Sequence, residues 1–332
     1  MKSRYFSKPV CVICGNDGFD KCVLFNLTKL YEKLGFSVII SKDPLDCHLL
    51  VIARGSDVKI PGNFSPKIPI HVYNYVGNSL SNILRKISDN PYYVISPSQD
   101  LLDYNSVEFS KGVVAFPPVY SDFWISHLTN QDINQMYEVA HIGNNKSDYG
   151  ASQDKYSILL SNAVCQGHID IWGKGWETEK LNSKYHGTVE VYNVKHIYAK
   201  TDIALGIMYP FQRELGTFSS RFWQAPLNGA LLLSEPNRYV GIIPGILEGD
   251  PTDLDPHIRQ KKSRQELIKE STVYWNNISV VAENHVKKIL DLSPPFRHNL
   301  ADYVPNKIMS TIFNVSFAYK SSTEYLMNLG FS

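Results

Sequence analysis

One stretch of the chain concentrates the residue types that bind phosphates and sugar hydroxyls. It places two hydroxyl side chains and an arginine at a predicted helix start, an amide one turn later, and a charged pair in the preceding polar loop. These residues are Arg213, Glu214, Ser219, Ser220, Arg221 and Gln224. Hydroxyls, free backbone amides and a guanidinium suit a diphosphate, and the amide of Gln224 would reach ribose hydroxyls. A serine cap beside a surface arginine is the plainer interpretation, and spacing alone does not separate the two.

Two glycine turns upstream have related chemistry. Each follows a predicted strand and combines small residues with a lysine. The residues concerned are Gly143, Asn144 and Lys146 in the first turn, and Gly173, Lys174 and Trp176 in the second. Glycines let backbone amides approach an anion, and helix N-termini favour phosphate. Ordinary turns with solvated lysines remain the alternative. Neither the GxGxxG pattern after the first strand nor a P-loop occurs in the sequence.

Other side chains could act on a second substrate. Asp17 and Asp20 follow the first predicted strand and could supply a general base, if the reaction needs one. His48 and His71 are weaker candidates for that base. An aromatic acceptor site is predicted after a later strand, from Tyr73, Tyr75 and Asn78. Because the chain has 20 tyrosines, ordinary packing competes with this role for any one of them.

The sequence predicts neither a metal site nor a tightly bound cofactor. Cys11 and Cys14 form a CxxC pair, but they lie in an apolar run and no second ligand pair has suitable spacing. Asp253 and Asp255 have the spacing of a metal-binding pair, but prolines bracket their loop and no strand leads into it.

These residues must be positioned by two successive sets of strands and helices. Short apolar runs predict strands at 10–14, 37–40, 49–53, 70–73, 92–96 and 112–116, and then at 137–142, 169–172, 188–191, 203–207 and 230–234. Helical periodicity is clear at 23–34 and 152–166. Such alternation is typical of parallel sheets covered by helices, which bind ligands at the carboxyl ends of their strands.

The predicted fold is therefore α/β, with two Rossmann-like domains whose parallel sheets face a cleft. We expect an N-terminal acceptor domain at 1–120, a linker at 121–136 and a donor domain at 137–300. The amphipathic, aromatic-rich segment 301–332 is predicted to be a C-terminal helix that packs back on the first domain.

The composition of the chain argues against several classes of function. The chain has 33 basic and 32 acidic side chains and a net charge of +1, which argues against a nucleic-acid partner held by bulk electrostatics. No apolar run is long enough to cross a membrane, and the start of the chain does not look like a secretory signal. Five cysteines in no disulfide pattern suggest a reduced, cytoplasmic protein.

Segments 170–176, 185–187 and 198–236 resemble the donor half of GT-B glycosyltransferases. Within that fold the chain is most similar to bacterial spore-maturation and surface-polysaccharide glycosyltransferases, over about residues 137–290. The resemblance implies that Gly173 and Trp176 shape a nucleotide pocket and that Arg221 faces the diphosphate. Gln224 would take the position that a ribose-binding glutamate usually holds, which is a departure from the family.

The resemblance implies transfer of a sugar from a UDP-, GDP- or CMP-linked donor to a hydroxyl of a saccharide or lipid-linked saccharide. It favours a metal-independent, retaining reaction in polysaccharide or lipopolysaccharide assembly, with transient, peripheral contact at the inner membrane. Arg213 and Arg221, supported by Lys146 or Lys174, would stabilise the leaving diphosphate. Two alternatives stay open: a catalytically silent GT-B-like scaffold that binds a nucleotide or sugar, and a sugar-nucleotide epimerase.

Overall fold

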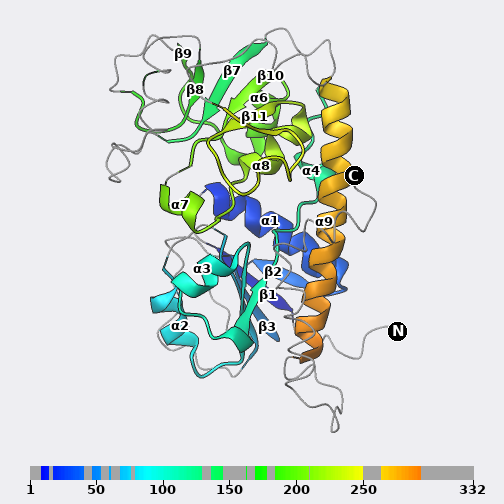
Figure 1. Ribbon diagram of the computed structural model, residues 1–332. Helices are drawn as coiled ribbons and strands as arrows, with labels where there is room; N and C mark the ends of the chain where they lie inside the picture. Colours follow the sequence, from blue (N-terminus) through cyan, green and yellow to red (C-terminus); the bar gives the residue numbers. More distant parts are fainter. Residues whose placement is uncertain are drawn as a thin grey trace. The chain divides into compact units, whose positions relative to one another are not determined.

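The computed structural model describes residues 9–14, 18–40, 47–53, 60, 68–75, 79–128, 136–144, 162, 169–177, 184–208, 210–249 and 263–292. The chain divides into two compact units (Figure 1). Unit 1 consists of Met1–Pro117 and Val281–Ser332, and unit 2 of Pro118–Val280. The predicted cleft between two domains stays a prediction.

Unit 1 contains a six-stranded parallel sheet in the order β2-β1-β3-β4-β5-β6. Its strands are β1 (Val10–Cys14), β2 (Val38–Ile40), β3 (Leu49–Ala53), β4 (Ile70–Tyr73), β5 (Tyr92–Ser96) and β6 (Gly112–Val114). The inner strands are buried on both faces, which explains why their sequences are continuous apolar runs rather than alternating ones.

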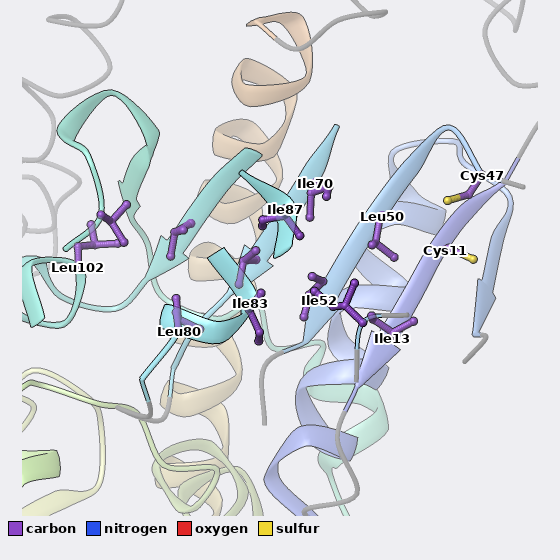
Figure 2. Packing of buried hydrophobic residues seen from close by; sticks show 14 residues of the cluster. Cys11, Ile13, Cys47, Leu50, Ile52, Ile70, Leu80, Ile83, Ile87 and Leu102 are labelled. Atoms are coloured by element: carbon purple, nitrogen blue, oxygen red, sulfur yellow. The ribbon is translucent and has the colours of Figure 1, made fainter. Parts of the chain in front are cut away.

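Helices cover this sheet. They are α1 (Gly18–Lys33), α2 (Ser81–Ile87), α3 (Gln99–Tyr104) and the 3-10 turn η1 (Phe109–Lys111). Alternate residues of β1 and β3, such as Ile13 and Ile52, pack with Ile83 and Ile87 of α2 in one apolar cluster (Figure 2). On the opposite face, α1 packs along β1, β2 and β3.

Unit 2 contains a second six-stranded parallel sheet, in the order β12-β11-β10-β7-β8-β9. Its strands are β7 (Tyr137–Ile142), β8 (Asp170–Trp172), β9 (Lys184–Tyr185), β10 (Thr201–Leu205), β11 (Leu231–Ser234) and β12 (Ile246–Glu248). Because all strands are parallel, their carboxyl ends share one edge of the sheet, and the loops that leave this edge include both glycine turns.

The other helices that the structure describes are mostly short. They are α4 (Ser121–Trp124), η5 (Val191–Asn193), α6 (Val194–Tyr198), α7 (Pro210–Glu214), α8 (Arg221–Gln224), η6 (Pro226–Asn228) and the long α9 (Arg264–Leu292). A buried aromatic cluster joins Phe218, Trp223 and Trp275 of α9 within unit 2.

Helix α9 contributes residues to both units, since the division falls at Val280. In unit 2, the hydroxyl of Ser279 donates to the Val119 carbonyl at 2.8 Å and accepts from the Val119 N–H at 2.9 Å. In unit 1, Glu283 of α9 pairs with Lys33 of α1 at 3.6 Å. The predicted donor domain included residues 281–292, whereas the structure groups them with unit 1. The segment 301–332 lies outside the described residues.

Most predicted strands are confirmed to within two residues at their ends, but the strand predicted at 188–191 is wrong. The edge strand is β9, and it ends before Gly187, which has a φ of 83°. Val191 instead opens η5, where the Asn193 N–H donates to the Glu190 carbonyl at 2.8 Å. Of the helix predicted at 152–166, the structure describes only Asn162, which is helical.

Among the described residues, no helix is both long and apolar enough to cross a membrane.

Candidate functional site

The two glycine turns meet at the carboxyl edge of the second sheet. Gly143 follows β7 and Gly173 follows the neighbouring strand β8, and the Gly143 N–H donates to the Trp172 carbonyl at 2.9 Å. Gly173 has a φ of 143°, and a β-carbon on it would lie 2.1 Å from the Gly143 carbonyl oxygen. Only glycine fits such an approach, so the sequence brings the two turns together.

Side chains from both turns fix this contact. The indole Nε1 of Trp176 donates to the Gly143 carbonyl at 2.7 Å, and the Lys174 N–H donates to Oδ1 of Asn144 at 3.0 Å. Trp176 is buried, whereas Lys174 and Asn144 are exposed. The pocket-shaping residues implied by the family resemblance therefore lie beside one another, and the lysine faces solvent at their rim.

Arg221 reaches the same edge from α8. Its Nε donates to the carbonyl of Ile142, the last residue of β7, at 2.9 Å. Its Nη1 donates to the carbonyl of Ile207, the second residue beyond β10, at 3.3 Å. Its Nη2 lies 2.5 Å from the point where a β-carbon on Gly143 would stand. The guanidinium is thus held by the end of β7 and the segment after β10, with one nitrogen directed at the glycine turn.

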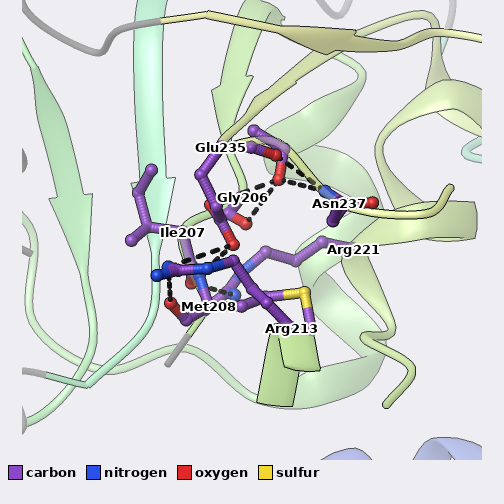
Figure 3. A network of polar contacts seen from close by, with 8 residues as sticks. Gly206, Ile207, Met208, Arg213, Arg221, Glu235 and Asn237 are labelled. Carbon is purple, nitrogen blue, oxygen red and sulfur yellow. Dashed lines mark hydrogen bonds and ion pairs between the residues drawn. The ribbon is translucent and has the colours of Figure 1, made fainter. Parts of the chain in front are cut away.

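Arg213 lies in the same network (Figure 3). Its Nη1 donates to the Met208 carbonyl at 3.0 Å and lies 3.9 Å from Oε1 of Glu235. Met208 directly follows Ile207, the residue that Arg221 contacts, so the two predicted arginines hold neighbouring carbonyls. Glu235 was not predicted as a site residue, although an acidic residue directly after a buried strand is a signal that could have indicated it.

His141 on β7 is a second functional candidate that the sequence did not reveal. Burial, and to a smaller extent the positive charge of Arg221, lower its pKa from 6.5 to about 3. The ring is therefore neutral at pH 7, and its Nδ1 is buried without a hydrogen-bond partner. It packs edge-to-face against Trp176 with ring centroids 5.8 Å apart.

Of the other predicted donor residues that the structure describes, Ser219, Ser220 and Gln224 lie at α8, and Glu214 is the last residue of α7. Helix α8 is only four residues long, and Ser220 at its N-cap makes no side-chain capping bond. The hydroxyl of Ser219 accepts the Arg221 N–H at 3.3 Å, so it supports the arginine. Gln224 is buried, and Glu214 is exposed. A ribose contact for Gln224 stays a prediction, as does the donor role of Glu214.

The predicted acceptor residues of unit 1 are placed only in part. Tyr73 and Tyr75 are buried at 2% and 1% exposure, so they offer no exposed aromatic platform. Tyr73 belongs to a buried polar cluster, in which the Tyr31 hydroxyl bonds Nδ1 of His71 at 2.6 Å and the Tyr73 hydroxyl at 3.0 Å. Burial lowers the pKa of His71 to about 3, which makes this histidine a neutral core residue.

Some predicted residues cannot be placed. Asp17, Asn78 and Lys146 lie outside the described residues, as do Asp253 and Asp255. Asp20 lies in the first turn of α1. Within the described ranges no group of three or more His, Cys, Asp or Glu side chains could hold a metal ion.

Two parallel six-stranded sheets with this connectivity define the GT-B fold of glycosyltransferases. Residues 156–248, which include both Gly173 and Arg221, match the model of a family described as glycosyl transferase-like. The match covers much of unit 2, including the Gly173 turn and Arg221 but not the Gly143 turn. Comparison with curated protein sequences finds no match.

Solved structures of the β-glucosyltransferase of phage T4 share this fold. The complex of that enzyme with UDP and Mn²⁺ is 14% identical, with a TM-score of 0.56 over 84% of this chain and 99% of that chain. A variant in complex with UDP-glucose is 16% identical, with a TM-score of 0.58 over 85% and 99%. A structure described as the DNA modifying enzyme β-glucosyltransferase is 14% identical, with a TM-score of 0.54 over 84% and 98%. At these identities the likeness concerns the fold.

Proposed function

We propose that the protein is a glycosyltransferase that moves a sugar from a nucleotide-sugar donor to an acceptor hydroxyl. The observation that carries this proposal is the position of Arg221. Its guanidinium is fixed by the last residue of β7 and by the segment that follows β10, and it directs Nη2 at the Gly143 turn. A preorganised cation at the carboxyl edge of a parallel sheet is what a leaving diphosphate needs. The family match over 156–248 and the GT-B fold support the same activity.

In this proposal the diphosphate binds at the paired glycine turns. The positive charges of Arg221 and Arg213 stabilise it, and the exposed Lys174 adds a third positive charge. Trp176 closes one side of the nucleotide pocket. UDP is the first nucleotide to test, because the phage enzyme of the same fold binds UDP-glucose. Sugar transfer is proposed to be metal-independent and retaining, with Asp17 or Asp20 as the base if it is inverting instead.

The proposed acceptor is a saccharide or lipid-linked saccharide of a bacterial surface polysaccharide. The near-zero net charge favours such an acceptor over DNA, since a polyanion is usually bound by excess positive charge. Because the phage enzyme is a DNA modifying enzyme, duplex DNA belongs among the acceptors tested.

Calorimetric titration with UDP, GDP, CMP and dTDP tests the donor site. We expect binding of one nucleotide at about micromolar Kd and a loss of about 10- to 100-fold in Arg221→Ala, since charge-assisted bonds contribute about 1.5–3 kcal/mol. The matched control is Lys269→Ala on the exposed face of α9. Binding of none of the four would reject the donor site, and binding without sugar release from any nucleotide-sugar would favour the silent scaffold.

A further inference from the structure

Glu235 carries a carboxyl group that is completely buried at the carboxyl end of β11. A buried charge is costly unless other groups pair with it and donate to it. Its Oε1 accepts the Met208 N–H at 3.0 Å and lies 3.9 Å from Nη1 of Arg213. Its Oε2 lies 3.3 Å from the Ser234 hydroxyl, which shares its one proton between this oxygen and the Gly206 carbonyl. Both oxygens are therefore engaged, and one partner is an arginine of the proposed donor site.

The contacts of Glu235 hold the segment that follows β10. The Met208 N–H donates to the Glu235 carboxylate, and the Met208 carbonyl accepts from Arg213. The two charged side chains therefore bind both backbone polar groups of one residue. The carbonyls of the two preceding residues, Gly206 and Ile207, accept from Ser234 and Arg221. Figure 3 shows these side chains converging on the segment. Its position thus depends on a polar network centred on the end of β11.

The protonation state of the Glu235 carboxyl group depends on its burial and on the charges near it. Burial raises the pKa of Glu235 to about 7, against the opposing effects of Arg213 and of the hydrogen bonds from Met208 and Ser234. The charged groups of this network are Arg213 from α7 and Arg221 from α8. Asn237, in the loop after β11, also belongs to this network and is neutral.

We infer that Glu235 is a positioning residue of the proposed donor site, which holds Met208 and Arg213 in place and takes up a proton when a nucleoside diphosphate engages Arg213. The inference rests on the proposed function. A diphosphate competes with the carboxylate for the guanidinium, and adds negative charge close by. A buried carboxylate that loses its counter-charge is disfavoured, so it binds a proton from solvent instead. The neutral acid still accepts the Met208 N–H.

The test is titration of the full chain with UDP at about pH 7, in two buffers that differ in ionisation enthalpy. The terminal phosphate of UDP also titrates near this pH, so the informative quantity is the difference between the native protein and Glu235→Gln. We expect net proton uptake to be greater in the native protein by a fraction of a proton per UDP. Glu235→Gln should keep its affinity within a few-fold, because the amide oxygen can still accept the Met208 N–H.

Glu235→Ala separates positioning from charge. It leaves the Met208 N–H without its partner, so we expect UDP affinity to fall about 10-fold relative to Glu235→Gln. Equal proton uptake in the native and glutamine proteins would overturn the inference while leaving the donor site intact. Equal affinities of the alanine and glutamine variants would overturn the positioning role. If no nucleotide binds the native protein, the donor site and this inference fall together.

Discussion

Gly173 approaches Gly143 so closely that a β-carbon on Gly173 would come within 2.1 Å of the Gly143 carbonyl oxygen. The neighbouring glycine turn at Gly187 differs, because a β-carbon there would meet nothing within 4 Å. Gly173 and Gly187 both have positive φ angles, so an alanine would strain the backbone at either position. Only at Gly173 would it also collide with a neighbouring turn.

Gly173→Ala should destabilise the fold by about 3 kcal/mol, through strain plus displacement of the Gly143 turn. Gly187→Ala should lower the free energy of unfolding by only about 1 kcal/mol, because backbone strain is the only penalty at that position. Urea unfolding of both variants measures the difference. Equal losses would mean that the two turns are not in contact in solution.

Arg221→Lys tests the geometry of the arginine rather than its charge. A lysine ammonium cannot reach both the Ile142 and Ile207 carbonyls in the fixed planar fork that the guanidinium provides. We expect UDP affinity to fall about 10-fold although the charge is kept. Calorimetry measures this change, and affinity equal to that of the native protein would show that charge alone suffices.

Arg264 at the start of α9 should be important for stability. Its guanidinium donates to the carbonyls of Thr201, Tyr198, Ala199 and Asn228, and it pairs with Asp202 at 3.2 Å. Arg264→Ala leaves several of these carbonyls without a donor, so we expect a loss of about 2–3 kcal/mol in the free energy of unfolding. Asp202→Asn removes only the ion pair and should cost less than about 1 kcal/mol. Similar losses in both variants would contradict this assignment.

Acid should destabilise the protein through its buried histidines. The pKa values of His71 and His141 fall from 6.5 to about 3 on folding, because burial disfavours the charged rings. Between these pH values the unfolded chain binds protons that the folded chain does not. Their contribution is therefore fully present above pH 6.5 and is lost as the pH falls toward 3, at about 1.4 kcal/mol per pH unit for each histidine.

Urea unfolding at several pH values from about 7 to 5 measures this slope. His141→Gln should reduce this slope by the contribution of one histidine, whereas the control Lys269→Ala, on the exposed face of α9, should leave it unchanged. A slope unaffected by His141→Gln would show that the ring is protonated or accessible in the folded state.

The sequence predicts the two sheets well because both faces of each inner strand are buried, which leaves continuous apolar runs such as 49–53. It fails at 188–191, where the alternation of Thr188, Val189, Glu190 and Val191 imitates a strand that Gly187 interrupts. The predicted helix from Ser219 shortens to α8, because Pro226 lacks the N–H needed to continue it.

The candidate site was predictable where local chemistry determines it. The glycine turns and Arg221 could be identified because small residues and a cation follow strands in the sequence. Glu235 and His141 could not, because their significance depends on burial and on partners distant in the chain. A glutamate after a strand and a histidine within one are common, and only the fold shows that both lie beside the arginines.

The division of α9 between the two units sets an order of assembly during synthesis. Unit 2 is one continuous stretch, Pro118–Val280, and all of its residues leave the ribosome before Val281 does. Unit 1 starts first, yet it cannot gain the contact between Lys33 and Glu283 until the rest of α9 has been made. Unit 1 therefore gains its part of α9, from Val281 on, only after the whole of unit 2 has been synthesised, and the domain begun first is the one finished last.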